Sequence, residues 1–377
     1  MHVVQVSFYV DPQARPPREL LRQWTSLGHI AGAVADNGDR VTVVQASQHR
    51  ERFHESGVEY CFLPPDTGGL ASSGEFAQLI AELVPDVFHV HGLSFGHEVR
   101  GLRRLCARTP ILLQDHADRV PRFWRRGSWR SGLACADGVS FCARGQAEAF
   151  VAARLLPPHT AVFEIAESTS EFSPGDRAAA RTLTGIHGDP ALLWVGHLDS
   201  NKDPLTVLTG ISAAVERLPG LTLWCCFATA PLREEVEQLI AGDPRLQSRV
   251  HLLGRVEHAR IETLMRAADL FVLGSHREGS GYSLMEALAC ALPPVVTDIP
   301  SFRMLTDAGR AGWLWKAGDA ASLTAALLQA ARAPRAAARD AARRQFEARS
   351  SRAAVGRGFG AAYRRLAARR AARGSHG

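Results

Sequence analysis

Short apolar runs alternate with longer stretches of helical periodicity along most of the chain. In the first half, such runs predict strands at His2 to Val10, Arg40 to Gln45, Glu59 to Leu63, Val87 to His91, Ile111 to Leu113, Gly138 to Phe141 and Ala161 to Ile165. After a polar, alanine-rich stretch, further strands are predicted at Ala191 to Val195, Leu221 to Phe227, Val250 to Leu253, Leu270 to Leu273 and Val295 to Thr297. Strands separated by helices form parallel sheets that are covered on both faces. The pattern therefore predicts an α/β fold with two Rossmann-like domains joined near residues 173 to 189.

A glycine-containing loop follows the run Leu270 to Leu273 and precedes an expected helix over Leu284 to Ala289. Glu278 stands at its start, and Gly279 and Gly281 permit unusual backbone angles and close approach of a ligand. Open α/β sheets bind ligands at the carboxyl ends of their strands, and a helix start presents N–H groups and a positive dipole end to an anion. The segment therefore predicts a binding site for a phosphate-bearing ligand.

The two carboxylates of this segment differ in whether a structural role could explain them. Ser283 and Glu286 have the S-x-x-E spacing of a capping box, in which Glu286 would only close the helix N-terminus. Glu278 has no comparable structural role, because a carboxylate before two glycines at a strand end more often faces a ligand.

The spacing of Glu278 and Glu286, followed by the sequence from Ala287 to Asp298, resembles the signature of retaining GT-B glycosyltransferases, family 4, also called glycosyl transferases group 1. The resemblance implies the GT-B fold, in which two Rossmann-like domains face each other across a cleft. It also implies transfer of a hexose from a nucleoside diphosphate sugar to a hydroxyl acceptor, which is a glycan, a lipid-linked molecule or a small molecule. In that family the first glutamate faces the donor sugar, the loop and helix start bind the diphosphate, and the second glutamate binds the ribose. These roles fall on Glu278, on Gly279, Ser280, Gly281, Tyr282 and Ser283, and on Glu286.

A second segment, after the run Ala191 to Val195, resembles the family's G-R-L-x(3)-K motif, whose basic residues hold the donor diphosphate. Gly196 and Lys202 match it, whereas His197 stands where the family usually has arginine. Histidine carries only a fractional charge near neutral pH, so a weaker or pH-dependent grip on the diphosphate is expected. The alternatives are that Lys202 is an exposed loop lysine and that His197 points away. Two further residues that follow the run Val250 to Leu253 are included as donor-binding candidates, namely Arg255 and Val256.

Histidines gather after two neighbouring strands of the first half, at His89, His91 and His116. Adjacent parallel strands bring these side chains to the same edge of the sheet. His116 resembles a histidine that the family places beside the donor sugar, which implies a catalytic role together with Glu278. A metal-dependent hydrolase with His89, His91, Asp115 and His116 as ligands is one alternative. Burial of one member of the pair His89 and His91 is the structural alternative.

Two loops depart from the family pattern. The turn from Asp11 to Pro17 lacks the glycine-rich loop of many relatives, and the segment Glu167 to Phe172 lacks their Asn-Gly pair. These altered loops leave a non-catalytic sugar-nucleotide binder as an alternative. A GT-B sugar-nucleotide epimerase, which shares the fold but uses no acceptor, is another. Because positive side chains and helix amides are expected to serve the diphosphate and no D-x-D pair is evident, neither a metal nor a cofactor is expected beyond the donor substrate.

The 377 residues favour two domains, expected as an acceptor-side domain over 1–172 and a nucleotide-sugar domain over 173–347, followed by a basic helix over 348–377. By resemblance this helix packs back on the first domain. No run of about twenty apolar residues and no signal pattern is present, so the expected location is cytoplasmic. Seven cysteines without a C-x-x-C pair indicate reduced core residues.

The net charge of +6 arises largely from the arginine-rich last forty or so residues. An apolar stripe runs through this stretch at Phe346, Val355, Phe359, Tyr363 and Leu366. The arginines are therefore expected to form a solvated helix face rather than a nucleic-acid surface. A peripheral contact of this basic face with anionic lipid head groups, on the inner face of the membrane, is the alternative. The sequence names neither the base, the hexose, the acceptor nor the oligomeric state.

Overall fold

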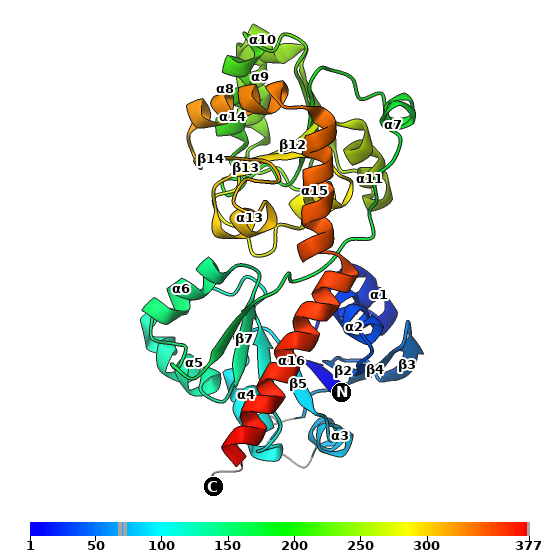
Figure 1. Ribbon diagram of the computed structural model, residues 1–377, viewed down its shortest axis with the longest axis vertical. Helices are drawn as coiled ribbons and strands as arrows, with labels where there is room; N and C mark the ends of the chain where they lie inside the picture. Colours follow the sequence, from blue (N-terminus) through cyan, green and yellow to red (C-terminus); the bar gives the residue numbers. More distant parts are fainter. Residues whose placement is uncertain (67–69, 71–73, 375–377) are drawn as a thin grey trace. The chain divides into compact units, whose positions relative to one another are not determined.

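The computed structural model describes residues 1–66, 70 and 74–374, and the chain divides into two compact units (Figure 1). Unit 1 combines Met1–Thr169 with the chain from Arg352 onward, and unit 2 is Ser170–Ser351. The sequence pattern places the boundaries nearby, at 172/173 and 347/348. Residues 375–377, at the end of the expected basic helix, lie outside the described residues.

Unit 1 is built on an eight-stranded sheet in the order β3-β4-β2-β1-β5-β6-β7-β8. The strands are β1 (His2–Ser7), β2 (Arg40–Ala46), β3 (Glu51–Glu55), β4 (Val58–Leu63), β5 (Val87–His91), β6 (Ile111–Gln114), β7 (Gly138–Phe141) and β8 (Ala161–Glu164). All neighbours are parallel except β3, which runs antiparallel to β4. The helices are α1 (Pro17–Gln23), α2 (Thr25–Asp36), α3 (Glu75–Leu83), α4 (Gly96–Leu105), η1 (Phe123–Arg125), α5 (Arg126–Leu133), α6 (Arg144–Ala152) and α16 (Arg352–Gly374).

The last helix, α16, lies alongside α2 and contacts β5 and β6 (Figure 1). Its apolar side is buried in the core of unit 1 at Val355, Phe359, Tyr363 and Leu366. The two helices approach so closely that a Cβ at Gly356 would lie 2.2 Å from the carbonyl oxygen of Ala33. These four residues of the apolar stripe read from the sequence therefore belong to the core of unit 1, whereas Phe346, the fifth, lies on α15 and is buried in the core of unit 2.

Unit 2 contains a six-stranded parallel sheet in the order β11-β10-β9-β12-β13-β14, the order of a dinucleotide-binding Rossmann sheet. Its strands are β9 (Ala191–Val195), β10 (Thr222–Cys226), β11 (Val250–Gly254), β12 (Leu270–Leu273), β13 (Pro294–Thr297) and β14 (Trp313–Trp315). Its helices are α7 (Arg177–Thr184), α8 (Pro204–Val215), α9 (Arg233–Gly242), α10 (Pro244–Gln247), α11 (His258–Ala267), α12 (Tyr282–Ala289), α13 (Pro300–Leu305), α14 (Ala320–Arg332) and α15 (Arg335–Arg349).

Strand order reverses at one point in each sheet, between β9 and β12 in unit 2 and between β1 and β5 in unit 1. At such a switch point the loops at the carboxyl ends of the two strands diverge to opposite faces and leave a crevice for a ligand. The loops after β9 and β12 are the two segments that the sequence singles out, so the fold brings both to the switch point of unit 2.

The sequence pattern misses two strands. β3 is an edge strand in which only Phe53 is buried, so it lacks a continuous apolar run, and β14 is only three residues long. The stretch 173 to 189, expected at the junction, contains α7, which packs against α11 within unit 2. All seven cysteines are free, and five are buried while Cys106 and Cys135 are half-buried. No helix in the described part of the chain is long and apolar enough to cross a membrane.

Candidate functional site

The loop after β9 is held in shape by its own backbone and side chains. Asp199 accepts a hydrogen bond from the backbone N–H of Lys202 at 2.9 Å, and Asp203 caps α8 by accepting from the N–H of Thr206 at 3.2 Å. Asp203 has a positive φ of 53°, which turns the chain sharply into the helix. Gly196, at the strand end, approaches β12 so closely that a Cβ would lie 3.1 Å from the Leu273 side chain. This geometry aims the Lys202 side chain toward the loop after β12.

The loop after β12 is tied to the first loop along its length. The backbone N–H of His276 donates to the carbonyl of Asn201 at 2.8 Å, and the Asn201 side chain donates to the carbonyl of Arg277 at 3.1 Å. A Cβ at Gly274 would lie 2.7 Å from the carbonyl oxygen of Lys202, so close packing of the two loops requires a glycine there.

Lys202 and Glu278 form an ion pair across the switch point of unit 2. The exposed fractions of their side chains are 15% and 14%, so the charges are largely withdrawn from water but reachable. The alternative that Lys202 is an exposed loop lysine is therefore wrong. Only two of the 44 basic residues of the chain are lysines, Lys202 and Lys316. A compact ammonium thus stands at this position in a chain that uses arginine almost everywhere else.

The helix after the second loop, α12, begins at Tyr282, and its N-cap is Gly281 with a φ of 67°. A Cβ at Gly281 would lie 2.9 Å from the Phe302 ring, so this turn requires glycine for both its conformation and its packing. Gly279 and the buried Ser280 lead into this turn, and Tyr282 and Ser283 form the first helical positions. The helix start therefore directs backbone N–H groups and a positive dipole end toward the loop that carries Glu278.

The capping-box interpretation of Ser283 and Glu286 is wrong, because Gly281 and not Ser283 is the N-cap of α12. Glu286 instead accepts a hydrogen bond from Nε2 of His258 at 2.6 Å, at the start of α11. This bond, together with the carboxylate's charge, raises the pKa of His258, although partial burial opposes the shift. Glu286 is thus a carboxylate of α12 that is paired with a titratable histidine of α11.

The remaining donor-binding candidates of unit 2 lie at neighbouring strand ends. His197 is exposed, and its Nδ1 accepts a hydrogen bond from the backbone N–H of Thr229 at 3.4 Å. Arg255 and Val256 follow β11 directly; Arg255 is exposed and Val256 is half-buried against the core of unit 2.

In unit 1, the predicted histidines form a connected cluster. The rings of His89 and His91 stack at 4.7 Å, and His89 Nδ1 lies 2.7 Å from the hydroxyl of Tyr363. His91 Nδ1 lies 3.0 Å from His116 Nε2, and His116 Nδ1 lies 2.7 Å from a carboxylate oxygen of Glu167. Both His89 and His91 are buried, and these partners are side chains. Both ring nitrogens of His116 are therefore engaged within unit 1.

The proton arrangement of this cluster follows from its partners. His91 Nε2 lies 3.2 Å from the side-chain oxygen of Gln5 and donates to it, so its Nδ1 accepts from His116 Nε2. His116 then donates from both nitrogens and is a cation. Burial opposes this charge, but the hydrogen bond from His116 to Glu167 and the charge of that carboxylate raise the pKa of His116. Burial and the neighbouring histidines hold the pKa of His91 well below its usual value.

The other members of this edge are also shifted by burial. Burial lowers the pKa of His89 to about 3, and burial with the nearby carboxylate of Asp118 raises the pKa of Asp115 to about 7. Asp115 accepts hydrogen bonds from the backbone N–H groups of Ala117 and Asp118, which fixes the turn that carries His116. Within the described ranges, no three histidine, cysteine, aspartate or glutamate side chains converge to hold a metal ion.

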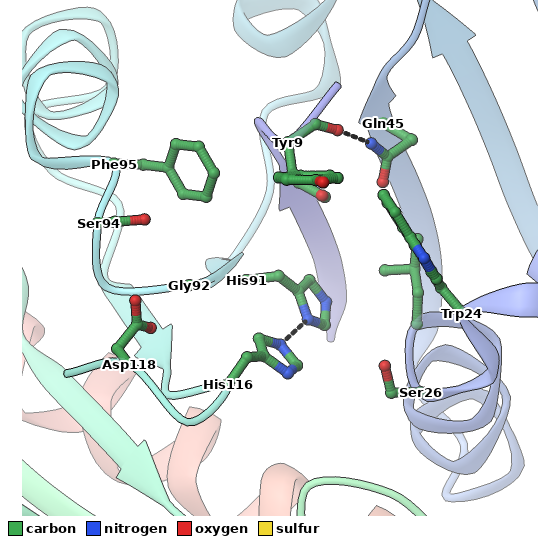
Figure 2. Close-up of a pocket in the computed structure, with 12 residues that line it drawn as sticks. Tyr9, Trp24, Ser26, Gln45, His91, Gly92, Ser94, Phe95, His116 and Asp118 are labelled. Carbon is green, nitrogen blue, oxygen red and sulfur yellow. Dashed lines mark hydrogen bonds between the residues drawn. The ribbon is translucent and has the colours of Figure 1, made fainter. Parts of the chain in front are cut away.

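A cavity of about 420 Å³ opens at the switch point of unit 1 (Figure 2). Figure 2 shows Trp24 and Tyr9 on one side, Phe95 on the other, and the His91 to His116 hydrogen bond between them. The rings of Tyr9 and Trp24 are 4.7 Å apart, and the carbonyl of Tyr9 accepts from the Gln45 side chain at 2.6 Å. Polar groups of Ser7, Ser26, Gln45, Ser94 and Asp118 also line the cavity.

The loop that lacks the family's glycines is ordered by one carboxylate. Asp11 is buried and accepts hydrogen bonds from the backbone N–H groups of Gln13 and Arg15 and from the Arg15 guanidinium at 2.7 and 2.8 Å. These bonds hold the pKa of Asp11 well below its usual range. An Asp-Arg clamp thus replaces backbone flexibility at this edge of the cavity.

A comparison with protein families matches a region that lies within unit 2. Residues 189–332 match the family model described as Glycosyl transferases group 1. Unit 2 therefore carries a glycosyl transferase group 1 domain. The resemblance to glycosyl transferases group 1, predicted from the spacing of Glu278 and Glu286, is confirmed for this range, which includes Lys202 and both glutamates.

Among curated proteins, the chain is 26% identical over 235 residues to a GDP-mannose:cellobiosyl-diphosphopolyprenol alpha-mannosyltransferase of Xanthomonas campestris, covering 60% of this chain and 59% of that one. It is 32% identical over 185 residues to a D-inositol 3-phosphate glycosyltransferase of Geodermatophilus obscurus, covering 45% and 40%. The match thus spans less than two thirds of the length of each relative.

Two solved structures match nearly the whole chain. A sucrose-phosphate synthase from Thermosynechococcus elongatus has a TM-score of 0.69 at 20% identity and covers 97% of this chain and 99% of its own. HepE of Anabaena, in complex with UDP, has a TM-score of 0.68 at 19% identity and covers 96% and 99%. At these identities the likeness concerns the fold, and the predicted GT-B fold class is confirmed.

Several residues of the two sites carry no recognisable signal in the sequence. Tyr9, Trp24 and Phe95 are scattered over the first hundred residues, and only the strand order brings them to one cavity. Glu167 lies where the sequence differs from the family pattern, and its pairing with His116 spans 51 positions. His258 could be suspected only from its position at the start of α11, close behind Arg255 and Val256.

Proposed function

We propose that the chain is a glycosyltransferase that moves a hexose from a nucleoside diphosphate sugar to a hydroxyl acceptor with retention of anomeric configuration. The observation that carries this proposal is the Lys202 and Glu278 pair beside the start of α12, at the switch point of the group 1 domain. A cation, a helix N-terminus and a carboxylate at one sheet edge suit the two halves of such a donor. The positive groups suit the diphosphate, and the carboxylate suits sugar hydroxyls.

The chemistry of the step follows from the charges. The bond between the anomeric carbon and the diphosphate oxygen breaks, its electrons leave with the diphosphate, and the acceptor oxygen forms the new bond from the same face. The acceptor's proton goes to the departing diphosphate. Negative charge therefore grows on the leaving group, where the α12 amides and Lys202 stabilise it, with His197 as a further donor. No divalent ion is required for this role.

The nucleoside end of the donor is assigned to the neighbouring strand ends. Glu286 is proposed to accept hydrogen bonds from the ribose hydroxyls, and Arg255 and Val256 to contact the base. The bond from His258 to Glu286 must be exchanged or shared when the ribose binds, since both use the same carboxylate. The relatives' names mention GDP-mannose and UDP, and the choice of base for this chain is decided by experiment.

The cavity of unit 1 is proposed to receive the acceptor. Its aromatic walls at Tyr9, Trp24 and Phe95 suit the apolar faces of a sugar ring, and its polar groups suit hydroxyls. His116, which is catalytic by resemblance, is proposed to act at this edge as a cation held by Glu167 rather than through an unengaged ring nitrogen. A glycan, a lipid-linked sugar or a small molecule meets these requirements.

A thermal-shift screen against UDP-, GDP-, ADP-, dTDP- and CDP-hexoses tests the donor assignment. One donor class should raise the melting temperature, and the shift should shrink in Lys202→Met but persist in Lys316→Met, whose lysine is exposed. Product analysis with and without candidate acceptors then separates transfer from epimerisation, which needs no acceptor. Metal analysis together with activity under chelation separates transfer from metal-dependent hydrolysis.

A further inference from the structure

An exposed aromatic pair stands on the surface of unit 1, in the connection from β6 to α5. Phe123 and Trp124 are the first two residues of the short helix η1, with exposed fractions of 76% and 61%. Their rings meet edge to face, with centroids 5.0 Å apart. Each ring therefore covers part of the other, and the remaining surface of both rings is exposed to water. Large apolar side chains exposed side by side are costly in water and mark an interaction surface.

The pair does not project because the segment is loosely attached. On one side Pro121 is buried, and on the other Trp129 is buried with its ring stacked on Phe150 at 6.4 Å. The Nε of Arg126 donates to the carbonyl of Pro121 at 3.4 Å and closes the turn between these anchors. The fold therefore holds the aromatic pair outward between two fixed points.

The pair is surrounded by positive charge. Residues 119–130 contain five arginines and no acidic residue: Arg119, Arg122, Arg125, Arg126 and Arg130. In the described part of the chain, none of these five forms an ion pair with a carboxylate, whereas arginines of α16 pair with Asp36 and Asp137. The guanidinium of Arg122 lies 5.3 Å from the centre of the Trp124 ring. The charge is thus available to a partner outside the protein.

We propose that this aromatic-basic surface, residues 119–130, docks unit 1 on an anionic lipid bilayer. Tryptophan and phenylalanine suit the boundary between head groups and acyl chains, and arginines above them suit lipid phosphates. Each arginine near an anionic membrane surface contributes about 1 kcal/mol, and the effect falls off within a Debye length. The surface thus combines insertion with charge, the two signals that stable peripheral binding needs.

Two other readings of the surface are less well supported by its geometry. Stacking of nucleic-acid bases needs open aromatic faces, but Trp124 has the edge of Phe123 against it and the Arg122 guanidinium over its ring. The basic helix α16, the lipid-contact alternative suggested by the sequence, has its apolar side buried in unit 1. Among the described side chains of α16, arginines remain exposed but no large apolar side chain does.

The location gives the docking surface a consequence for the acceptor. Asp118 lines the cavity of Figure 2, and Arg119 is the next residue. The cavity and the surface therefore both lie beyond the carboxyl end of β6. An acceptor hydroxyl carried by a lipid would then enter the cavity from the bilayer on which the surface docks. Docking itself does not rest on the proposed function, because it requires only the surface.

Vesicle flotation with the full chain tests the proposal. We expect binding to vesicles of phosphatidylcholine with about 30% phosphatidylglycerol, weak binding to pure phosphatidylcholine, and loss of binding in 0.5 M salt. The triple variant Arg122→Gln/Arg125→Gln/Arg126→Gln should bind about 100-fold more weakly, from about 1 kcal/mol per arginine. The double variant Phe123→Ser/Trp124→Ser keeps the arginines but lacks the inserting side chains. It should therefore bind anionic vesicles at low salt but no longer at moderate salt, where the unchanged chain still binds.

Matched controls remove the same groups elsewhere. Arg357→Gln/Arg364→Gln/Arg365→Gln deletes three exposed arginines of α16, and Leu183→Ser deletes an apolar side chain that is 75% exposed on α7. Both should bind vesicles as the unchanged chain does, and melting temperatures should confirm that all variants fold. Absence of binding to anionic vesicles overturns the proposal, as does equal loss in the α16 control. Tight binding of a single-stranded RNA oligomer that depends on Phe123 and Trp124 would also overturn it.

Discussion

The ion pair between Lys202 and Glu278 leads to opposite expectations for the two partners. In the ligand-free chain the ammonium is balanced by the carboxylate. Glu278→Gln removes that balance and leaves Lys202 as a cation beside the α12 N-terminus. A bare nucleoside diphosphate should then bind as tightly as before, or more tightly. Lys202→Met instead removes the cation and should weaken binding of the same ligand.

The magnitudes follow from the burial of the pair. Both side chains are largely withdrawn from water, and a charge-assisted hydrogen bond in such a place contributes roughly 1.5 to 3 kcal/mol. Lys202→Met should therefore weaken nucleoside diphosphate binding about 10- to 150-fold. Glu278→Gln should lower transfer at least about tenfold, because a neutral amide keeps the size but loses the charge-assisted bonds to sugar hydroxyls.

Calorimetric titration with the nucleoside diphosphate and steady-state transfer with the intact donor measure the two effects separately. Melting temperatures show whether each variant keeps its fold, and Lys316→Met controls for the loss of a lysine. The reasoning is refuted if Glu278→Gln weakens nucleoside diphosphate binding as much as Lys202→Met, because the pair would then serve only to hold the loops. Near-normal turnover of Glu278→Gln would remove that glutamate from the mechanism.

Three other predictions concern charge and pH. Because the pKa of His116 is raised in the folded chain, its protonation stabilises the fold fully below about pH 6.5, and this stabilisation is lost as the pH rises through the folded-state pKa. Glu167→Gln should therefore lower the free energy of unfolding most near pH 6 and least at alkaline pH. Denaturant unfolding at several pH values checks this, and a difference that grows with pH would contradict it. Donor affinity should weaken between about pH 6 and 8.5 in the unchanged chain and stay flat in His197→Arg, as measured by calorimetry, whereas parallel profiles would show that His197 never meets the diphosphate. Transfer should persist in excess EDTA, and its loss with recovery on adding manganese or magnesium would revive the metal-dependent alternative.

Much of the fold can be predicted from the sequence because both sheets are parallel and buried. Such strands are continuous apolar runs, and the runs at Ala191 to Val195 and Leu270 to Leu273 coincide with β9 and β12. Edge strands give a weaker signal, since β3 buries only Phe53. The order of the strands is not written in any single run, yet it decides which loops meet.

The candidate site shows the same division. Glycines and charged residues close together in the sequence, as from Glu278 to Glu286, are recognisable because one loop contains them all. The partners that distant segments supply are not, and each changes an interpretation. His258 occupies the carboxylate of Glu286, and Glu167 engages His116, because the sheet edge brings these groups together over 28 and 51 positions.

The scarcity of lysine permits a direct test of donor binding at Lys202. Carbon-13 labelling at lysine Cε gives two side-chain signals, one each from Lys202 and Lys316, and Lys202→Met assigns them. Nucleoside diphosphate sugars of the five common bases are titrated in the presence of EDTA. One of them should shift the Lys202 signal saturably and leave the Lys316 signal in place. Signals that stay unmoved across the whole panel, or that move together, would contradict the assignment of this sheet edge to a nucleoside diphosphate sugar.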